Sequence, residues 1–325
     1  MSKKILITGG LGYIGSHIAN LIKDKAVIID NMSNSKLDHK KYLKNAFIIK
    51  KDVNYKNLTN IFKEYEIEGV IHLAGYKSVL RSIKDPLNYY HNNFVQTLEM
   101  LEVIDKFKIK KLIFSSSATV YGNKNLCPIY ENSPLQGINP YANTKIQIEK
   151  LLEDYCKSNK NFKAVSLRYF NPIGCDLASG LTDQPIGEPQ NLVPLLIHSI
   201  INKKKLKIFG NDYNTPDGSC IRDYIHVCDL AEAHLIVFEN FKNIKNYSVY
   251  NIGKGKGLSV FELISIFEKT NQIKIPYIIS KRREGDAEIS YASNLKMKKD
   301  FNWIPKRTYE NMCYDSWNGY LNQNV

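Results

Sequence analysis

Near its start the chain runs from an apolar strand through a glycine turn into an amphipathic helix, and this junction constrains the fold more than any other stretch. Lys4-Ile5-Leu6-Ile7-Thr8 has the length and composition of a buried strand. Gly9, Gly12 and Gly15 follow it in a G-x-x-G-x-x-G spacing. Apolar residues then recur with helical periodicity as far as Ile22. In this context glycines let the backbone approach a pyrophosphate, which the helix N-terminus attracts, so the junction predicts a dinucleotide site.

A second strand indicates which dinucleotide is bound. Ala26-Val27-Ile28-Ile29-Asp30 ends in an acid 21 residues after Gly9. A carboxylate there accepts both hydroxyls of an adenosine ribose and repels a 2'-phosphate. The sequence therefore predicts NAD rather than NADP.

Apolar segments of strand length continue to alternate with helical segments. Residues 46–50, 69–73 and 111–115 are such segments, and near-continuous apolar strands indicate a parallel sheet covered on both faces. We therefore expect an α/β fold with a doubly wound parallel-sheet Rossmann domain. Ligands of such sheets bind beyond the carboxyl ends of the strands, where Asp52, residues 74–77 and residues 115–117 fall.

The composition changes after Tyr169. Residues 171–221 are rich in Gly, Pro, Asp and Asn, with one helical segment near 192–202. We expect an NAD-binding domain of residues 1–170, to which residues 223–252 return, and a smaller α/β substrate-binding lobe of residues 171–325.

Tyr141 and Lys145 form a pair suited to proton transfer. Asn139 can cap a helix that Pro140 opens, and residues four apart on a helix are neighbours. A tyrosine that acts as a base near pH 7 needs its pKa lowered by about three units from ~10. An adjacent ammonium and a cationic nicotinamide are the two charges expected to lower it.

Composition argues against several other classes. The net charge of +13 comes from scattered lysines, whereas nucleic-acid binding requires a basic face with aromatic residues or a known motif. The six cysteines form no CxxC pair and no metal-ligand spacing, so we expect free thiols and no metal site. No apolar run approaches the ~18 residues that span a bilayer. We expect a cytoplasmic protein that binds neither nucleic acid nor membrane.

Longer strings resemble a known family. They are Thr8-Gly9-Gly10-x-Gly12-Tyr13-Ile14-Gly15, Ser115-Ser116-Ser117-Ala118-Thr119-Val120-Tyr121-Gly122, Tyr141-x-x-x-Lys145, Leu167-Arg168-Tyr169-Phe170-Asn171-Pro172, Arg222-Asp223-Tyr224-Ile225-His226-Val227 and Arg282-Arg283-Glu284-Gly285-Asp286. Together they resemble the extended short-chain dehydrogenase/reductases and, among them, the UDP-glucose 4-epimerase family. The resemblance implies interconversion of UDP-glucose and UDP-galactose through a 4-keto sugar, with tightly bound NAD reduced and reoxidised in each turnover.

The same resemblance implies roles for individual residues. Tyr141 would take the proton from the sugar 4-hydroxyl, Lys145 would hold Tyr141 ionised and bond the nicotinamide ribose, and Ser117 would hydrogen-bond the reacting oxygen. The implied cofactor contacts beyond the glycines are Tyr13, Ile14, Asp30, Asn31, Met32, Ser33, Asn34, Ser35, Asp52, Val53, Leu73, Ala74, Gly75, Tyr76, Lys77, Asn92, Ser117, Tyr141, Lys145 and Phe170. The implied UDP-hexose contacts are Ser117, Tyr141, Asn171, Leu192, Lys207, Ile208, Phe209, Arg222, Arg283 and Asp286. A homodimer packed through helices at Asn92 to Lys106 and Tyr141 to Asn159 is implied as well.

One position departs from the family pattern. Four residues after the aspartate of the Arg-x-Gly-Asp stretch, the family places a side chain near the sugar's 2-substituent, and a tyrosine there tends to exclude an N-acetyl group. An ungapped count reaches Ser290, with Tyr291 next to it. The hypothesis is a wide pocket that also accepts UDP-GlcNAc and UDP-GalNAc.

Two other functions fit parts of the sequence. A nucleotide-sugar 4,6-dehydratase shares the fold, NAD, tyrosine and lysine, but such enzymes resemble one another in an Asp-Glu pair where this chain has Ala118-Thr119. A non-catalytic NAD-binding protein usually lacks the base or its lysine, and here Ser117, Tyr141 and Lys145 are all present. Both functions fit the sequence less well than that of a 4-epimerase.

Overall fold

The structure, a computed structural model, describes residues 3–35, 38–183, 186–187, 189–283 and 285–323. Within them seven strands form one sheet. They are β1 (Lys4–Thr8), β2 (Ala26–Ile29), β3 (Phe47–Ile49), β4 (Ile67–His72), β5 (Lys111–Ser117), β6 (Lys163–Tyr169) and β10 (Tyr247–Ile252). Their order is β10-β6-β5-β4-β1-β2-β3, and every neighbouring pair is parallel. The direction of winding reverses between β1 and β4, which is where ligands of such sheets bind.

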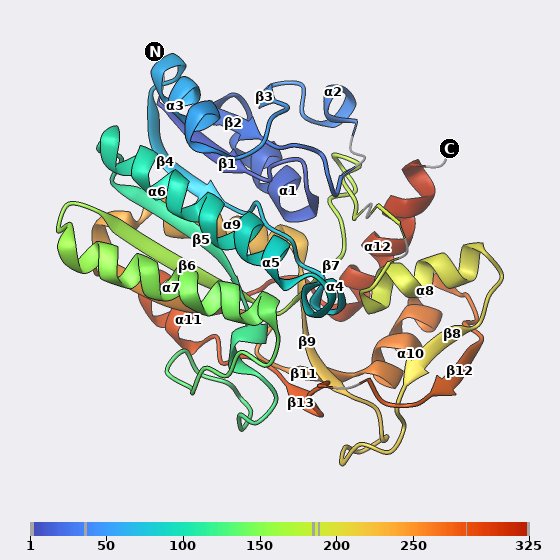
Figure 1. Ribbon diagram of the computed structural model, residues 1–325. Coiled ribbons are helices and arrows are strands. Elements are labelled where there is room, and N and C mark those ends of the chain that lie inside the picture. The colour runs from blue at the N-terminus through green and yellow to red at the C-terminus, as the bar shows by residue number, and fades with distance from the viewer. Residues whose placement is uncertain (1–2, 36–37, 184–185, 188, 284, 324–325) are drawn as a thin grey trace.

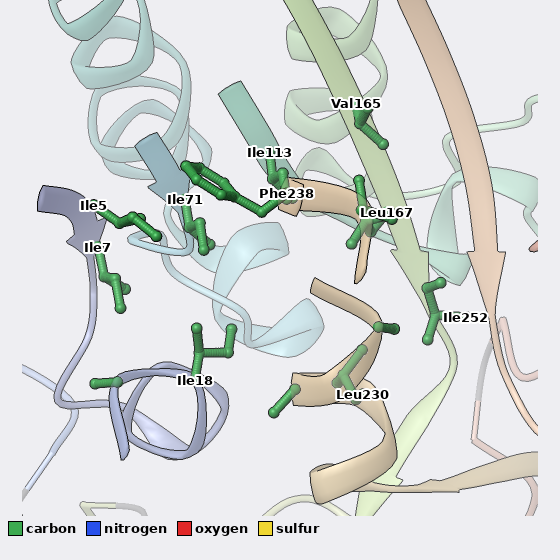
Figure 2. Packing of buried hydrophobic residues seen from close by; sticks show 14 of the residues in the cluster. Ile5, Ile7, Ile18, Ile71, Ile113, Val165, Leu167, Leu230, Phe238 and Ile252 are labelled. Atoms are coloured by element: carbon green, nitrogen blue, oxygen red, sulfur yellow. The ribbon is translucent and has the colours of Figure 1, made fainter. Parts of the chain in front are cut away.

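Helices bury both faces of this sheet. In β1, Ile5 and Ile7 belong to one apolar cluster and Leu6 to the other, as the period of two in a strand requires. Helices α1 (Tyr13–Ile22), α9 (Val227–Glu239) and α11 (Leu295–Phe301) supply the first cluster, part of which Figure 2 shows. Helices α3 (Tyr55–Glu64), α6 (Gln96–Lys106) and α7 (Pro140–Ser158) supply the second. The α/β fold class predicted from the sequence is confirmed.

A smaller lobe lies beside the carboxyl ends of these strands (Figure 1). Strand β9 (Ile221–His226) pairs with β7 (Asn171–Ile173), β11 (Gly257–Ser259) and β13 (Ile289–Ser290), and β8 (Leu206–Phe209) pairs with β12 (Tyr277–Ser280). Helices α8 (Leu192–Ile201), α10 (Val260–Asn271) and α12 (Tyr309–Gln323) share a separate apolar core with these strands. The remaining short helices are α2 (His39–Tyr42), α4 (Val79–Lys84), α5 (Pro86–Tyr89), the π-helix Tyr90–Val95 and the 3₁₀ turns Lys23–Lys25, Ala118–Tyr121 and Phe241–Asn243.

The chain passes between the two parts more than once. After β9, helix α9 packs against α1, and β10 pairs along β6 at the edge of the large sheet. Helix α11, which the sequence assigned to the lobe, packs against β10 and adds Met297 to the core of the large sheet. Residues 227–252 thus pack on the large sheet, whereas β9 pairs within the lobe. The predicted return of residues 223–252 and the domain boundaries stay predictions.

Candidate active site

A cleft of about 580 Å³ lies between the large sheet and the lobe. It is lined by the turn after β1, the ends of β2, β4, β5 and β6, the start of α7, and β8 and β9. Sequence-distant segments therefore meet at the carboxyl ends of the parallel strands, as predicted for this fold.

The glycine turn forms one end of the cleft. Gly12 caps α1, and Gly9 has a φ of +68°, which favours glycine. A Cβ at Gly15 would lie 2.5 Å from the Gly9 carbonyl oxygen, and one at Gly9 would lie 2.7 Å from the Ala74 nitrogen. The turn thus has no room for side chains and presents its backbone to the cleft, which fits a pyrophosphate.

Asp30 follows β2 at the same end. Its carboxylate accepts hydrogen bonds from the backbone amides of Leu11 (3.0 Å) and Met32 (2.7 Å), and burial raises its pKa. The two amides fix the carboxylate beside the glycine turn, where it can accept the hydroxyls of an adenosine ribose.

The segment after β4 forms another part of the cleft lining. Leu73, Ala74, Gly75, Tyr76 and Lys77 all line the cleft. The side chain of Asn93, in the π-helix, accepts from the Tyr76 amide at 2.8 Å and donates to the Tyr76 carbonyl at 3.1 Å. A π-helical turn often marks a functional site. This π-helix also carries Asn92, which lines the cleft.

Ser117, Tyr141 and Lys145 come together at the end of β5. Asn139 caps α7 by accepting from the Ala142 amide at 2.9 Å, so Tyr141 stands in the first turn. The Lys145 ammonium lies 5.8 Å from the centre of the Tyr141 ring and donates to the Ser115 carbonyl at 2.7 Å. Both side chains are buried, with 9% of Tyr141 and 4% of Lys145 exposed.

Burial is the largest influence on the pKa values of Tyr141 and Lys145. It raises the pKa of Tyr141, which the hydrogen bond with Ser117 opposes, and it lowers the pKa of Lys145 to about 7. The sequence predicted a tyrosine pKa lowered by the neighbouring ammonium together with a cationic nicotinamide, whereas burial among the protein's own groups raises it. The reason is that desolvation penalises both charged forms.

The lobe brings cationic side chains to the other end of the cleft. Arg222 pairs with Asp286 at 3.6 Å, and the Arg283 guanidinium lies 3.9 Å from the centre of the Phe209 ring. Lys207 lines the cleft near them. Guanidinium groups form paired, charge-assisted hydrogen bonds with phosphate oxygens, so this end suits a diphosphate.

The structure brings most of the predicted site residues to this one cleft. Three of them do not line it, namely Met32, Asp52 and Ser290. Met32 packs against the core of the large sheet, and Asp52 accepts a hydrogen bond from Asn31 at 2.8 Å. Glu284 of the Arg-x-Gly-Asp string lies outside the described residues. The roles of all these residues stay predictions.

Ser290 lies one strand away from the cleft wall. In β13 it pairs in parallel register with Arg222, so the two residues are on the same face of the small sheet. Tyr291 is directed to Gly257, where an added Cβ would come within 3.0 Å of the tyrosine ring. The register thus favours Ser290 over Tyr291 as the residue on the side of the cleft.

Sequence reasoning missed several lining residues. Tyr224 lines the cleft, and its place two residues after Arg222 in β9 puts it on the same face, so strand alternation was the available signal. Asp183 also lines the cleft. Burial raises the pKa of its carboxyl, and the positive charge of Lys77 offsets part of this rise. It belongs to the loop-rich part of the lobe, and no pattern in the sequence indicated it.

No group of three or more His, Cys, Asp or Glu side chains among the described residues is arranged to hold a metal ion. None of the helices in that part of the chain is long and apolar enough to cross a membrane.

Comparison with protein families shows which family the chain belongs to. The model of the NAD dependent epimerase/dehydratase family matches residues 5–253. The chain belongs to this family. Among the epimerase/dehydratase relatives, UDP-glucose 4-epimerase of Dictyostelium discoideum is 42% identical over 327 residues, which cover 97% of this chain and 94% of the relative. The resemblance to UDP-glucose 4-epimerases stated from the sequence is confirmed.

Solved structures of the family agree. UDP-glucose 4-epimerase from Bifidobacterium longum, in complex with NAD⁺ and UDP, is 37% identical with a TM-score of 0.93 and covers 99% of both chains. The UDP-Glc/GlcNAc 4-epimerase from Campylobacter jejuni is 32% identical with a TM-score of 0.84, and it covers 99% of this chain and 100% of that one.

Proposed function

We propose that this protein interconverts UDP-glucose and UDP-galactose at C4, with NAD as its cofactor. The observation that carries the proposal is the grouping of Ser117 with the buried Tyr141 and Lys145 between the glycine turn and the arginines of the lobe. A dinucleotide placed along the turn and a diphosphate placed at the arginines would leave the sugar beside Tyr141.

Each residue has a task in such a reaction. NAD, when bound, supplies the hydride acceptor and donor. Tyr141 takes the proton of the 4-hydroxyl and returns it when the epimer forms. Ser117, whose oxygen also accepts from the Thr119 hydroxyl at 2.9 Å, holds the reacting oxygen. The positive charges of Lys145 and of the oxidised nicotinamide stabilise the phenolate against the cost of burial.

The surroundings of Ser117 argue against a 4,6-dehydratase. Elimination needs an acid and a base next to the sugar, and the positions after Ser117 are Ala118 and Thr119 in a short 3₁₀ turn. With an alanine and a hydroxyl there, these two positions supply neither the acid nor the base of the elimination.

We also propose that the enzyme accepts UDP-N-acetylhexosamines. The argument rests on the small side chain of Ser290, which is on the same strand face as Arg222, where a tyrosine would project further toward the cleft. The Campylobacter relative that carries both sugar types in its name has the same fold.

One experiment tests both proposals. The purified protein, with no added cofactor, is incubated with UDP-galactose or with UDP-N-acetylgalactosamine, and the epimers are separated by chromatography. Conversion of both supports the wide pocket. Conversion of UDP-galactose alone rejects the argument from Ser290, and conversion of neither rejects the epimerase.

A homodimer and a cytoplasmic location remain proposals as well. The first candidate dimer segment, Asn92 to Lys106, exposes Val95 and Leu98, and Leu87 just before it is 82% exposed. The second, on α7, exposes Lys150, Asp154 and Lys157, which pair within the helix. Sedimentation of the wild type and of Leu98→Lys tests the dimer, since a lysine in a buried interface should shift the protein to the monomer.

A further inference from the structure

Three consecutive serines at the end of β5, residues 115–117, hold successive turns of α7. The carbonyl of the first accepts from Lys145 at 2.7 Å, the hydroxyl of the second donates to Glu149 at 2.5 Å, and the third hydrogen-bonds Tyr141. Tyr141, Lys145 and Glu149 are four residues apart and so lie on one helix face. Glu149 is therefore the third polar member of the face that carries the reaction.

The Glu149 carboxylate is fixed by charged partners. It is 4% exposed, and Arg168 donates to it through Nε at 2.9 Å and through Nη2 at 2.6 Å. Arg168 is itself held by the Tyr121 hydroxyl at 2.8 Å and the Glu131 carbonyl at 3.0 Å. A carboxylate with two such bonds and a serine cannot reorient without breaking the network.

The charge of this carboxylate favours the protonated form of Lys145, which lies one helix turn away. Burial lowers the pKa of Lys145 to about 7, and the opposing cause is the negative charge of Glu149. Glu131 is a further acidic group near Arg168, and burial raises the pKa of its carboxyl. The remaining described side chains around Lys145 and Glu149, which include Tyr247 of β10 with a raised pKa, carry no negative charge near neutral pH. The others are His72 of β4, Phe114 of β5, Tyr169 and Arg168 of β6, Tyr121 of the 3₁₀ turn, and Tyr89 of α5. Burial and the charge of Lys145 lower the pKa of His72 to about 3. The centre of the Phe114 ring lies 4.7 Å from the Lys145 ammonium.

We propose that Glu149 is a positioning residue for the reaction, a fixed negative charge that keeps the Lys145 ammonium protonated beside Tyr141 at working pH. The proposal rests on the proposed function, because it acts through the tyrosine and lysine assigned there. Arg168 and Ser116 serve it by holding the carboxylate in place.

The direction of the effect follows from the charges. An amine whose pKa is held up by a carboxylate loses its proton at lower pH once the carboxylate is neutral. A neutral Lys145 no longer stabilises the Tyr141 phenolate. Loss of the Glu149 charge should therefore bring the alkaline decline of activity to lower pH and move the ionisation of Tyr141 to higher pH.

The test uses Glu149→Gln in the protein with its bound cofactor. We expect the alkaline limb of kcat against pH to move down by about one unit, which is about tenfold less activity above that limb. Tyr141 ionisation, measured as phenolate absorbance relative to the same protein with Tyr141→Phe, should move the other way.

Glu149→Gln leaves Arg168 buried without its counter-charge, which can prevent folding. The double variant Glu149→Leu/Arg168→Met removes both charges and keeps an apolar volume. Its alkaline limb should move in the same direction as that of Glu149→Gln. The shift should be smaller, because the positive charge of Arg168, which disfavours protonated Lys145, is lost as well.

Glu131→Gln is the matched control. Glu131 accepts from the Asn251 amide at 2.9 Å in the same network, and a glutamine oxygen can keep that bond. Its pH profile should match the wild type.

Profiles of the Glu149 variants that coincide with the wild type, or an equal shift in Glu131→Gln, would overturn the proposal. A wild type without epimerase activity would instead remove the proposed function, and the phenolate titration would still decide the role of Glu149.

Discussion

The two ends of the cleft are built differently. At the end that faces the large sheet, Asp30, Tyr141 and Lys145 are nearly buried. A backbone amide fixes Asp30, the capped first turn of α7 fixes Tyr141, and a backbone carbonyl fixes Lys145. At the lobe end, the side chains of Arg222 and Asp286 are 19% and 36% exposed, and their separation of 3.6 Å is that of a loose pair. Rigid buried groups suit a reaction that depends on protonation and position, whereas exposed long side chains suit the capture of a diphosphate.

This difference predicts that changes near the sheet act on turnover and cofactor, and that changes in the lobe act on substrate affinity and choice. Four sets of substitutions test the division, in order of expected effect.

Tyr141→Phe should have the largest effect. Loss of the proton acceptor should lower kcat by about 10²- to 10⁴-fold, while the protein still binds NAD. Steady-state kinetics and the NAD content of the purified variant measure the two parts. Tyr155→Phe, on the same helix but bonded to Asp105, is the control and should turn over normally. Near-normal turnover by Tyr141→Phe would remove the role assigned to it.

Gly15→Ala should come next, through the cofactor. Its Cβ would meet the Gly9 carbonyl oxygen at 2.5 Å and Gly10 Cα at 2.6 Å, so the turn must shift. We expect NAD affinity to fall by about tenfold or more, because a shift costs the backbone contacts to the pyrophosphate. Gly12→Ala, whose nearest contact is 3.3 Å, should lose less. Equal affinities of the two variants, measured by calorimetry, would contradict this account of the turn.

Arg283→Met should act on KM. Loss of a charge-assisted bond to the diphosphate should raise the KM for UDP-galactose by about tenfold to a hundredfold with little change in kcat. Arg282→Met is the matched neighbour, since Arg282 pairs with Asp212 at 2.7 Å and does not line the cleft. A fall in kcat as large as the rise in KM would show that the lobe is not a separate capture site.

Ser290→Tyr should have the smallest effect on the plain sugar and a selective effect on the acetylated one. UDP-galactose turnover should stay within about twofold, while UDP-N-acetylgalactosamine should lose at least tenfold, because the ring fills the space of the acetyl group. Unchanged turnover of the acetylated sugar would reject the hypothesis of a wide pocket.

Features that depend on local backbone geometry could be predicted from the sequence. The glycine turn, the acid that ends β2 and the tyrosine and lysine of α7 are set by short-range spacing, and all of them line the cleft. Features set by tertiary packing could not. The return of α11 to the large sheet and the position of Asp183 depend on contacts between distant segments.

The protonation of Tyr141 and Lys145 illustrates the same limit. The sequence places an ammonium beside a phenol but says nothing of how deeply either is buried. In the structure burial raises the pKa of Tyr141 and lowers that of Lys145, and Glu149, which no motif singled out, is the charge that favours the protonated lysine.

In the proposed reaction hydride leaves C4 and returns to the same carbon inside one site. The most direct measurement follows deuterium at C4 of UDP-galactose through its conversion by the purified protein in ordinary water, without added cofactor. The account predicts UDP-glucose that keeps the deuterium at C4. Product whose C4 carries solvent hydrogen instead would contradict it.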